Sequence, residues 1–272
     1  MRASSRPGPA AAPPHAEVPM PTSLRLVTIV SLALHSGGAL AQEALRAYGP
    51  GGPAPAMKEA AEAFSRARRV KVEVTAGPTD TWLAKARQDA DLIFSGAEYM
   101  MTDFVNALEG RVDEATIVSL YLRPSAILVR PGNPKRIQGL PDLAKPGLKV
   151  LVVQGAGQTG LWEDMAGKQG DLGLVRALRR NIVHHAPNTG AAKQTWTERP
   201  EIDAWIVYNI WQVANPALAD LVPVGKEHVI YRSCGAALTK KGAARPEARR
   251  FLEFLQSAEG AAIFRRWGWM VP

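Results

Sequence analysis

Short apolar segments alternate with helical patterns along the first third of the chain. A short apolar segment at 44–48 leads into a glycine-rich loop and an amphipathic helical pattern over 54–65. Apolar and polar residues alternate over 70–76, as in a half-buried strand, and residues 92–94 form a short apolar run. Three strands that each lead into a loop of small residues and a helix predict a parallel sheet, with ligands bound at the carboxyl ends of its strands.

The same pattern starts again in the middle of the chain. A strand is predicted at 126–130, and further strands at 148–153, 182–185 and 203–208 are each followed by polar or glycine-rich residues. The C-terminal stretch 246–264 predicts two helices with their large apolar residues facing inward.

Two such sets predict an α/β protein with two lobes and a ligand cleft between them. Residues 42–124 and about 232–272 are expected to form the first lobe, and residues 125–231 the second. The chain would cross between the lobes near residues 122–127 and 228–235, and closure on a ligand would be a hinge motion.

The loop Gly49–Pro53 is the most distinctive feature of the first set of strands. Its glycines allow the backbone to approach a ligand, because no Cβ is in the way. The helix that follows presents unpaired N–H groups and the positive end of its dipole. The loop therefore predicts an anion site, although a cluster of glycine and proline is also typical of a simple turn.

Some polar residues near the loops have more than one interpretation. Thr79 or Asp80 is expected to cap the helix that follows, and Ser257 to cap the second C-terminal helix. Glu98 suits a first helical turn. Asp80 and Glu98 are alternatively acceptors for a monoprotonated phosphate, or groups that repel a dianion.

The N-terminal region resembles a secretory signal. Met20 is followed by a basic residue, an apolar run over 26–34 and an Ala-x-Ala site that ends at Ala41. Residues 1–41 are therefore expected to be a signal region, with the true start at Met20 and a mature chain that begins near Gln42 in the periplasm.

Charge and cysteine content narrow the function further. The net charge is +8, and residues 1–41 carry three arginines and one glutamate, so the mature chain carries +8 − 2 = +6. Its basic residues are scattered, which argues against a nucleic-acid partner and is compatible with a small anion. Cys234 is the only cysteine, so no intramolecular disulfide is possible. The mature two-lobed chain is expected to be a monomer.

Several motifs occur in the right order from about residue 45 to the end of the chain. Because of these motifs, the sequence resembles the accessory colonization factor C family. The motifs are Gly-Pro-Gly-Gly-Pro at 49–53, Gly77-Pro78 with Trp82, Asp91-Leu-Ile-Phe94, Arg130-Pro-Gly-Asn-Pro134, Gly155-Ala-Gly157, Thr159-Gly-Leu-Trp-Glu-Asp-Met165, Asn181-Ile-Val183, Pro187-Asn-Thr-Gly190, Asp203-Ala-Trp-Ile206, Tyr231-Arg232 and Gly268-Trp269. Two loops differ from the family pattern, with only Gln158 between Gly157 and Thr159, and Ser-Gly-Ala-Glu at 95–98.

That family is similar to the sulfate- and molybdate-type periplasmic binding proteins, so the resemblance implies the two-lobed type II periplasmic-binding-protein fold. It also implies capture of a small, sulfate-like oxyanion for an ABC-type importer with a membrane permease. An organic anion such as a phosphonate, a sulfonate or an amino acid is an alternative ligand. A surface colonization or adhesion factor without a small-molecule ligand is an alternative function.

The chemistry of the ligand selects the candidate site residues. A fully ionised tetrahedral anion has only acceptors, so backbone N–H groups and hydroxyls can bind it without a countercharge. The predicted ligand-binding residues, all but one in loops at strand ends or helix starts, are Gly51, Gly52, Thr79, Thr81, Ser95, Gly157, Thr159, Gly160, Asn188, Thr189 and Tyr208.

The sequence offers little for an enzyme, and we expect no catalytic residues, no metal and no cofactor. His184 and His185 are adjacent on a predicted strand, where they point to opposite faces and cannot hold one metal ion together. No nucleophile elbow, zinc-protease motif or phosphate-loop lysine is present. The tryptophans are expected mostly in the core, with one of them or Tyr208 facing the cleft.

Overall fold

Three parallel strands form one end of the sheet, as the sequence predicts. The computed structural model describes residues 43–155 and 157–271. Strand β1 (Leu45–Gly49) lies between β2 (Val72–Ala76) and β3 (Leu92–Phe94) and pairs with both in parallel. Edge strand β2 is only half buried, whereas all three residues of β3 are buried. This explains why β2 alternates polar and apolar residues and β3 does not.

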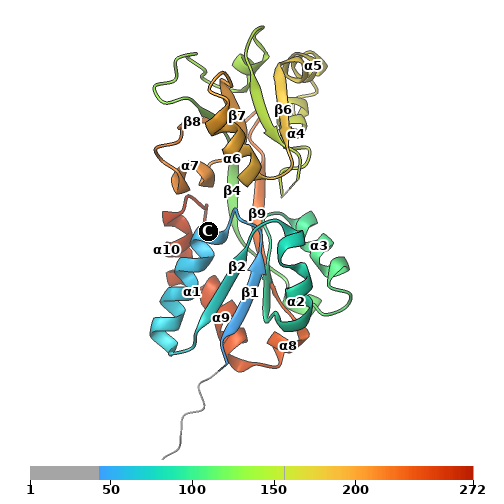
Figure 1. The fold of residues 1–272 in the computed structure, drawn as a ribbon, viewed down its shortest axis with the longest axis vertical. Helices are drawn as coiled ribbons and strands as arrows, with labels where there is room; N and C mark the ends of the chain where they lie inside the picture. Colours follow the sequence, from blue (N-terminus) through green and yellow to red (C-terminus); the bar gives the residue numbers. More distant parts are fainter. Residues whose placement is uncertain (1–42, 156, 272) are drawn as a thin grey trace, which may run out of the picture. The chain divides into compact units, whose positions relative to one another are not determined.

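A second parallel group forms the other end of the same sheet (Figure 1). Strand β5 (Val150–Val153) lies between β6 (Ile182–Ala186) and β7 (Ala204–Tyr208). Every residue of β5 and β7 is buried, as is typical of strands with both faces covered. The restart of the pattern predicted from the sequence is therefore confirmed.

Two long antiparallel strands join the two groups. Strand β4 (Val118–Val129) pairs over residues 118–124 with β9 (Tyr231–Leu238). It pairs over 125–129 with β7 and over 126–129 with β8 (Asp220–Pro223). Strand β9 also pairs with β3. The strand predicted at 126–130 covers only the end of β4. The prediction is corrected, because the strand begins eight residues earlier, at Val118.

We call the residues packed around β1 to β3 the first lobe and those packed around β5 to β8 the second lobe. The helical elements of the first lobe are α1 (Ala54–Arg68), η1 (Thr79–Thr81), α2 (Leu83–Asp89), α3 (Glu98–Ala107), η2 (Glu114–Thr116), α8 (Lys240–Ala243), α9 (Pro246–Gln256) and α10 (Ala258–Arg266). Those of the second lobe are η3 (Leu140–Ala144), α4 (Leu161–Gly167), α5 (Leu172–Asn181), α6 (Thr189–Glu198) and α7 (Ile210–Ala214). The exact boundaries predicted for the lobes stay a prediction.

Helices cover both faces of each strand group. In the first lobe, Phe64 of α1 packs with Phe251 of α9 in one cluster, and Trp82 and Phe104 pack with Tyr48 in another. In the second lobe, Trp196 of α6 and its neighbours form a third cluster. Residues 43–271 lie in one compact unit, which supports the single large sheet.

The helix caps divide into one confirmed and one wrong prediction. The Ser257 hydroxyl accepts a hydrogen bond from the Gly260 N–H at 3.2 Å, which caps α10 as predicted. Neither Thr79 nor Asp80 caps α2, because the 3₁₀ turn η1 follows Pro78 and places Trp82 at the cap position.

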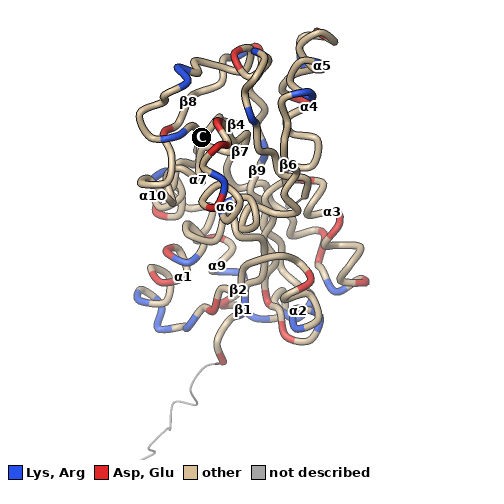
Figure 2. Tube along the Cα trace, turned by 45° about the horizontal axis from the view of Figure 1, so that its top comes forward, with Lys and Arg blue, Asp and Glu red and all other residues tan. Residues whose placement is uncertain are grey.

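Residues 1–41, predicted as a signal region, lie outside the described residues. Within the described ranges, no helix is long and apolar enough to cross a membrane. Figure 2 shows lysines and arginines interleaved with acidic residues over both lobes rather than gathered in one platform.

Candidate ligand-binding site

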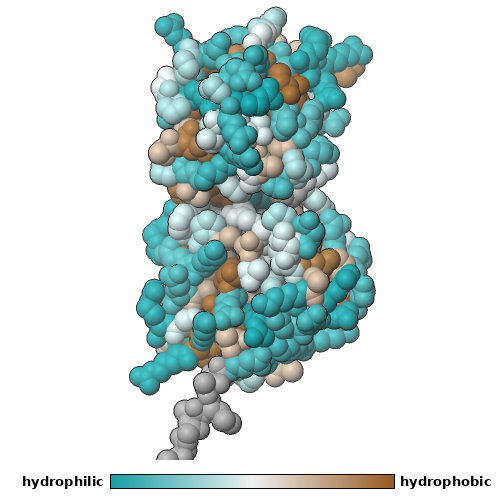
Figure 3. Space-filling model, viewed as in Figure 1, coloured by the Kyte–Doolittle hydropathy of each residue, from teal (hydrophilic) through white to brown (hydrophobic). Residues whose placement is uncertain are grey.

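The loops at the carboxyl ends of the parallel strands surround two adjoining cavities. The inner cavity, about 150 Å³, lies among the loops that follow β1, β2 and β6, with β4 and α7. The outer cavity, about 500 Å³, also borders α3 and the loop after β5. They share the walls formed by Pro50, Gly77, Pro78 and Asn188. Figure 3 shows residues of intermediate hydropathy around the level where the two lobes meet.

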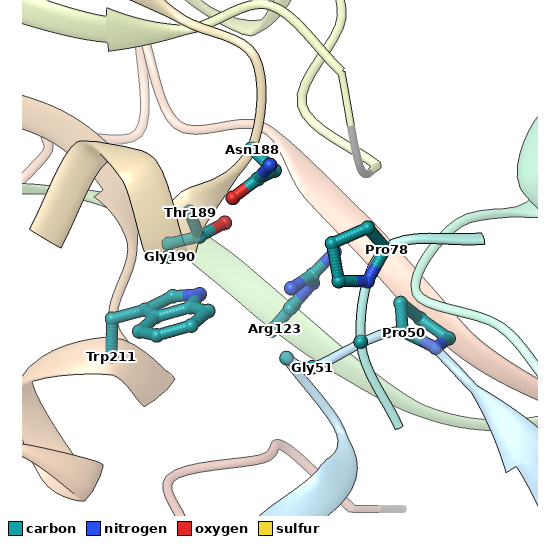
Figure 4. A pocket seen from close by; sticks show the side chains of 10 residues that line it. Pro50, Gly51, Pro78, Arg123, Asn188, Thr189, Gly190 and Trp211 are labelled. Carbon is teal, nitrogen blue, oxygen red and sulfur yellow. The ribbon is translucent and has the colours of Figure 1, made fainter. Parts of the chain in front are cut away.

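Arg123 lies at the centre of the inner cavity (Figure 4). It belongs to β4 and is only 1% exposed. Its Nη2 donates a hydrogen bond to the Gly96 carbonyl at 2.5 Å. Its guanidinium carbon lies 4.0 Å from the ring centre of Tyr208 and 5.6 Å from that of Trp269, so two aromatic faces hold its plane.

No carboxylate pairs with Arg123 among the described residues. Its Nε is buried and makes no hydrogen bond. Burial lowers the pKa of its guanidinium, but arginine remains charged in proteins. A buried charge costs free energy unless it is paired. An anion that enters the cavity would therefore be stabilised by this guanidinium.

Three glycines leave room for the guanidinium. A Cβ at Gly52 would lie 2.8 Å from Nη1, one at Gly96 would lie 2.8 Å from Nη2, and one at Gly157 would lie 3.0 Å from Nη2. The φ angle of Gly52 is not in the left-handed region, so this residue is glycine for space and not for backbone freedom. The loop Gly49–Pro53 therefore approaches an arginine side chain as well as the cavity.

Two further donors belong to the inner cavity. Trp211 turns its indole toward the cavity (Figure 4), and its Nε1–H has no hydrogen-bond partner in the described chain. The Thr189 hydroxyl accepts a hydrogen bond from Gln158 Nε2 at 2.7 Å, which leaves its own proton available to a ligand. Both groups suit a ligand that offers acceptors.

The N-terminus of α6 adds a positive dipole end at this cavity. Asn188 is its cap, and its Oδ1 accepts a hydrogen bond from the Ala191 N–H at 2.9 Å. Thr189 and Gly190, the first residues of α6, line the cavity. This geometry favours a negative group, because the first N–H groups of a helix carry partial positive charge.

The eleven residues predicted from the sequence fall into three groups. Those that line the inner cavity are Gly51, Gly52, Asn188 and Thr189. Those that line the outer cavity are Thr79, Gly157 and Thr159, and Asn188 borders both cavities. Those outside the lining of either cavity are Thr81, Ser95, Gly160 and Tyr208.

Three of these four outlying residues have side-chain contacts of their own. The Thr81 hydroxyl donates to the Pro78 carbonyl at 2.7 Å, and the buried Ser95 hydroxyl accepts from the Gly235 N–H at 3.3 Å. Tyr208 is fully buried beneath Arg123, and burial raises its pKa to about 12. It therefore supports the guanidinium as a neutral ring.

Arg123 itself is absent from the sequence-based prediction. The signal that could have found it is a charged residue inside the apolar run Val118–Val129, which burial on a central strand makes unusual. The adjacent Pro124 obscured this signal, because proline within a run argues against a central strand.

Among the described residues, no group of three or more histidine, cysteine, aspartate or glutamate side chains is placed to hold a metal ion. His185 Nε2 lies 2.8 Å from Nη1 of Arg179, and His184 Nε2 lies 3.5 Å from the Thr195 hydroxyl. The two histidines thus have separate neighbours. Cys234 is free and buried in β9, where burial raises its pKa to about 12.

The sequence profile described as "Bacterial extracellular solute-binding protein" matches residues 45–270. The chain belongs to this family. None of the curated protein sequences matches this solute-binding protein.

Solved structures agree with this assignment. PEB3 from Campylobacter jejuni is 35% identical, with a TM-score of 0.78 over 84% of this chain and 100% of that one. A PEB3 structure with bound L-phospholactate is also 35% identical, with a TM-score of 0.79 and the same coverage.

A more distant relative shares the fold alone. The sulfate-binding protein SubI from Mycobacterium tuberculosis is 19% identical, with a TM-score of 0.71 over 84% of this chain and 86% of that one. The predicted type II periplasmic-binding fold and the resemblance to sulfate- and molybdate-type proteins are thus confirmed. The family and these neighbours are binding proteins rather than enzymes.

Proposed function

We propose that this solute-binding protein captures a small anion in the inner cavity, with Arg123 as its countercharge. The observation that carries the proposal is the buried guanidinium without a carboxylate partner at the centre of the cavity. The unpaired Trp211 N–H, the Thr189 hydroxyl and the start of α6 add donors. Among the described residues, no acidic side chain lines this cavity. An anion with only acceptors matches such a site.

A sulfate-like oxyanion is the first candidate ligand. The inner cavity has room for several water molecules, and hence for a tetrahedral oxyanion. An organic anion is the second candidate, because the outer cavity adjoins the inner one and would hold further atoms. The L-phospholactate bound to PEB3, a phosphate ester with a carboxylate, is an example of such an anion in a related protein.

The proposed setting is the periplasm, where the monomeric protein would deliver its ligand to the permease of an ABC-type importer. Membership of the extracellular solute-binding family and the signal-like sequence that ends at Ala41 support this setting. A surface colonization factor without a small-molecule ligand is the competing function, and it predicts no binding of any anion.

Isothermal titration calorimetry of the mature protein with sulfate, phosphate and L-phospholactate tests the proposal. At least one anion should bind, and Arg123→Met should weaken it about ten- to a hundredfold, as loss of a charge-assisted hydrogen bond implies. Arg66→Met is the control for the loss of one positive charge, because Arg66 is exposed on α1 and lines neither cavity. Wild-type affinity in Arg123→Met would contradict the assignment, and no binding to the wild type would favour the colonization factor.

A further inference from the structure

The outer cavity carries negative charge, in contrast to the inner one. Asp80 in η1 and Asp103 in α3 both line it, from two segments of the first lobe. Both are exposed, and neither makes a hydrogen bond or an ion pair within the described residues. Since Asp80 does not cap α2, its carboxylate has no structural partner.

The basic inner cavity and the acidic outer cavity adjoin each other. Gly157 lines the outer cavity, and a Cβ there would lie 3.0 Å from Nη2 of Arg123. Pro50, Gly77, Pro78 and Asn188 border both cavities. The buried guanidinium, with an unbonded Nε and no carboxylate partner among the described residues, is independent of the two acids and itself points to a ligand.

Aromatic and apolar groups line the outer cavity between these charges. Tyr99 and Asp103 are four residues apart on α3 and so lie on one face of it. The Tyr99 hydroxyl accepts a hydrogen bond from the Thr159 N–H at 3.3 Å, which joins α3 to the loop after β5. A ligand tail that reaches the outer cavity would therefore lie beside Tyr99 and near two carboxylates.

We propose that Asp80 and Asp103 are specificity-determining residues, which favour an organic anion with a cationic tail and disfavour one with a second negative charge. This inference rests on the proposed function, because it needs the anionic head to bind at Arg123. The chemical class is a zwitterion with a phosphate or sulfonate head and an ammonium group a few atoms away. Repulsion of a wrong ligand by fixed charges is a common source of specificity.

Three phosphate monoesters with the same head isolate the effect of the tail: phosphoethanolamine (cationic), ethyl phosphate (neutral) and L-phospholactate (anionic). Calorimetry should give the tightest binding for phosphoethanolamine and the weakest for L-phospholactate, with about three- to tenfold between neighbours, as exposed charges allow. In Asp80→Asn/Asp103→Asn the three affinities should come within about threefold of one another. Asp113→Asn removes the same charge outside both cavities and should preserve the order.

The outcomes separate this inference from the proposed function. Equal affinities for the three esters in the wild type, or the same order in the double variant, would overturn the role of Asp80 and Asp103. The Arg123 site would survive that result if ethyl phosphate still bound and lost affinity in Arg123→Met. Absence of binding by all three esters, by inorganic phosphate and by sulfate would overturn both.

Discussion

Arg123 and the glycines around it depend on each other at the scale of single residues. The guanidinium occupies the space that side chains at positions 52, 96 and 157 would need. Its plane rests on Tyr208, whose ring is fully buried. The glycine-rich loop after β1 therefore has a second reason for its composition besides close approach to a ligand.

Gly52→Ala tests this dependence. The new Cβ would lie 2.8 Å from Nη1 of Arg123, so the guanidinium must shift, and affinity for the bound anion should fall about tenfold or more. Gly51→Ala is the control for stability, because its Cβ would meet no atom within 4 Å. Calorimetry and thermal unfolding of both variants give the comparison. Wild-type affinity in a folded Gly52→Ala protein would show that the guanidinium position is not what binds the anion.

At the scale of helices, Glu59 joins α1 to the C-terminal end of α10. Its carboxylate accepts hydrogen bonds from Arg266 Nη2 and from Trp267 Nε1, the latter at 2.6 Å. These bonds, the one from Arg266 first, hold the pKa of Glu59 below its usual 4.5. The folded state thus binds fewer protons than the unfolded state near and below that pH.

The sign of this shift gives a pH prediction. The contribution of Glu59 to the free energy of unfolding is present above about pH 4.5 and is lost as the pH falls through its lower folded-state pKa. Glu59→Gln should cost on the order of 1 kcal/mol at pH 7 and show a shallower loss of stability on acidification. Glu62→Gln, an exposed residue of the same helix, is the control. Parallel acid-unfolding curves for wild type and Glu59→Gln would contradict the prediction.

The elements show what sequence patterns can and cannot predict. The alternation in β2 and the buried runs in β3, β5 and β7 were predictable, because burial on one or both faces determines residue type directly. The first half of β4 was not predictable from the sequence. Proline argues against a central strand, and Pro124 is held in one by its pairing with Tyr231 of β9, which is far away in the sequence. The loop residues at the strand ends were predictable as cavity walls, whereas Arg123 required the tertiary packing of three loops around one side chain.

At the scale of the whole described unit, the two lobes are connected through β4 and β9. Their antiparallel pairing over residues 118–124 and 231–236 is the stretch about which a hinge motion would occur. Two contacts join parts that such a motion would separate: Tyr99 to Thr159, and Arg232 to Asp164.

Small-angle scattering tests hinge closure. We expect the radius of gyration to decrease when the tightest-binding anion among sulfate, phosphate and L-phospholactate is added, and the molecular mass to be that of a monomer. Arg123→Met should need about ten- to a hundredfold more of the same anion for the same decrease. Profiles that superimpose with and without a ligand of proven affinity would argue against closure.

The most direct test of the central claim is the thermal stability of Arg123→Met with and without anion. Because the unpaired buried charge costs free energy in the ligand-free fold, the variant should melt at the same temperature as the wild type or higher. Phosphate at about 100 times its wild-type Kd should stabilise the wild type by about 2.7 kcal/mol and the variant, with binding about ten- to a hundredfold weaker, by only about 0.4–1.4 kcal/mol. A ligand-free variant that melts lower and still responds to phosphate like the wild type would mean that Arg123 serves the fold and not the anion.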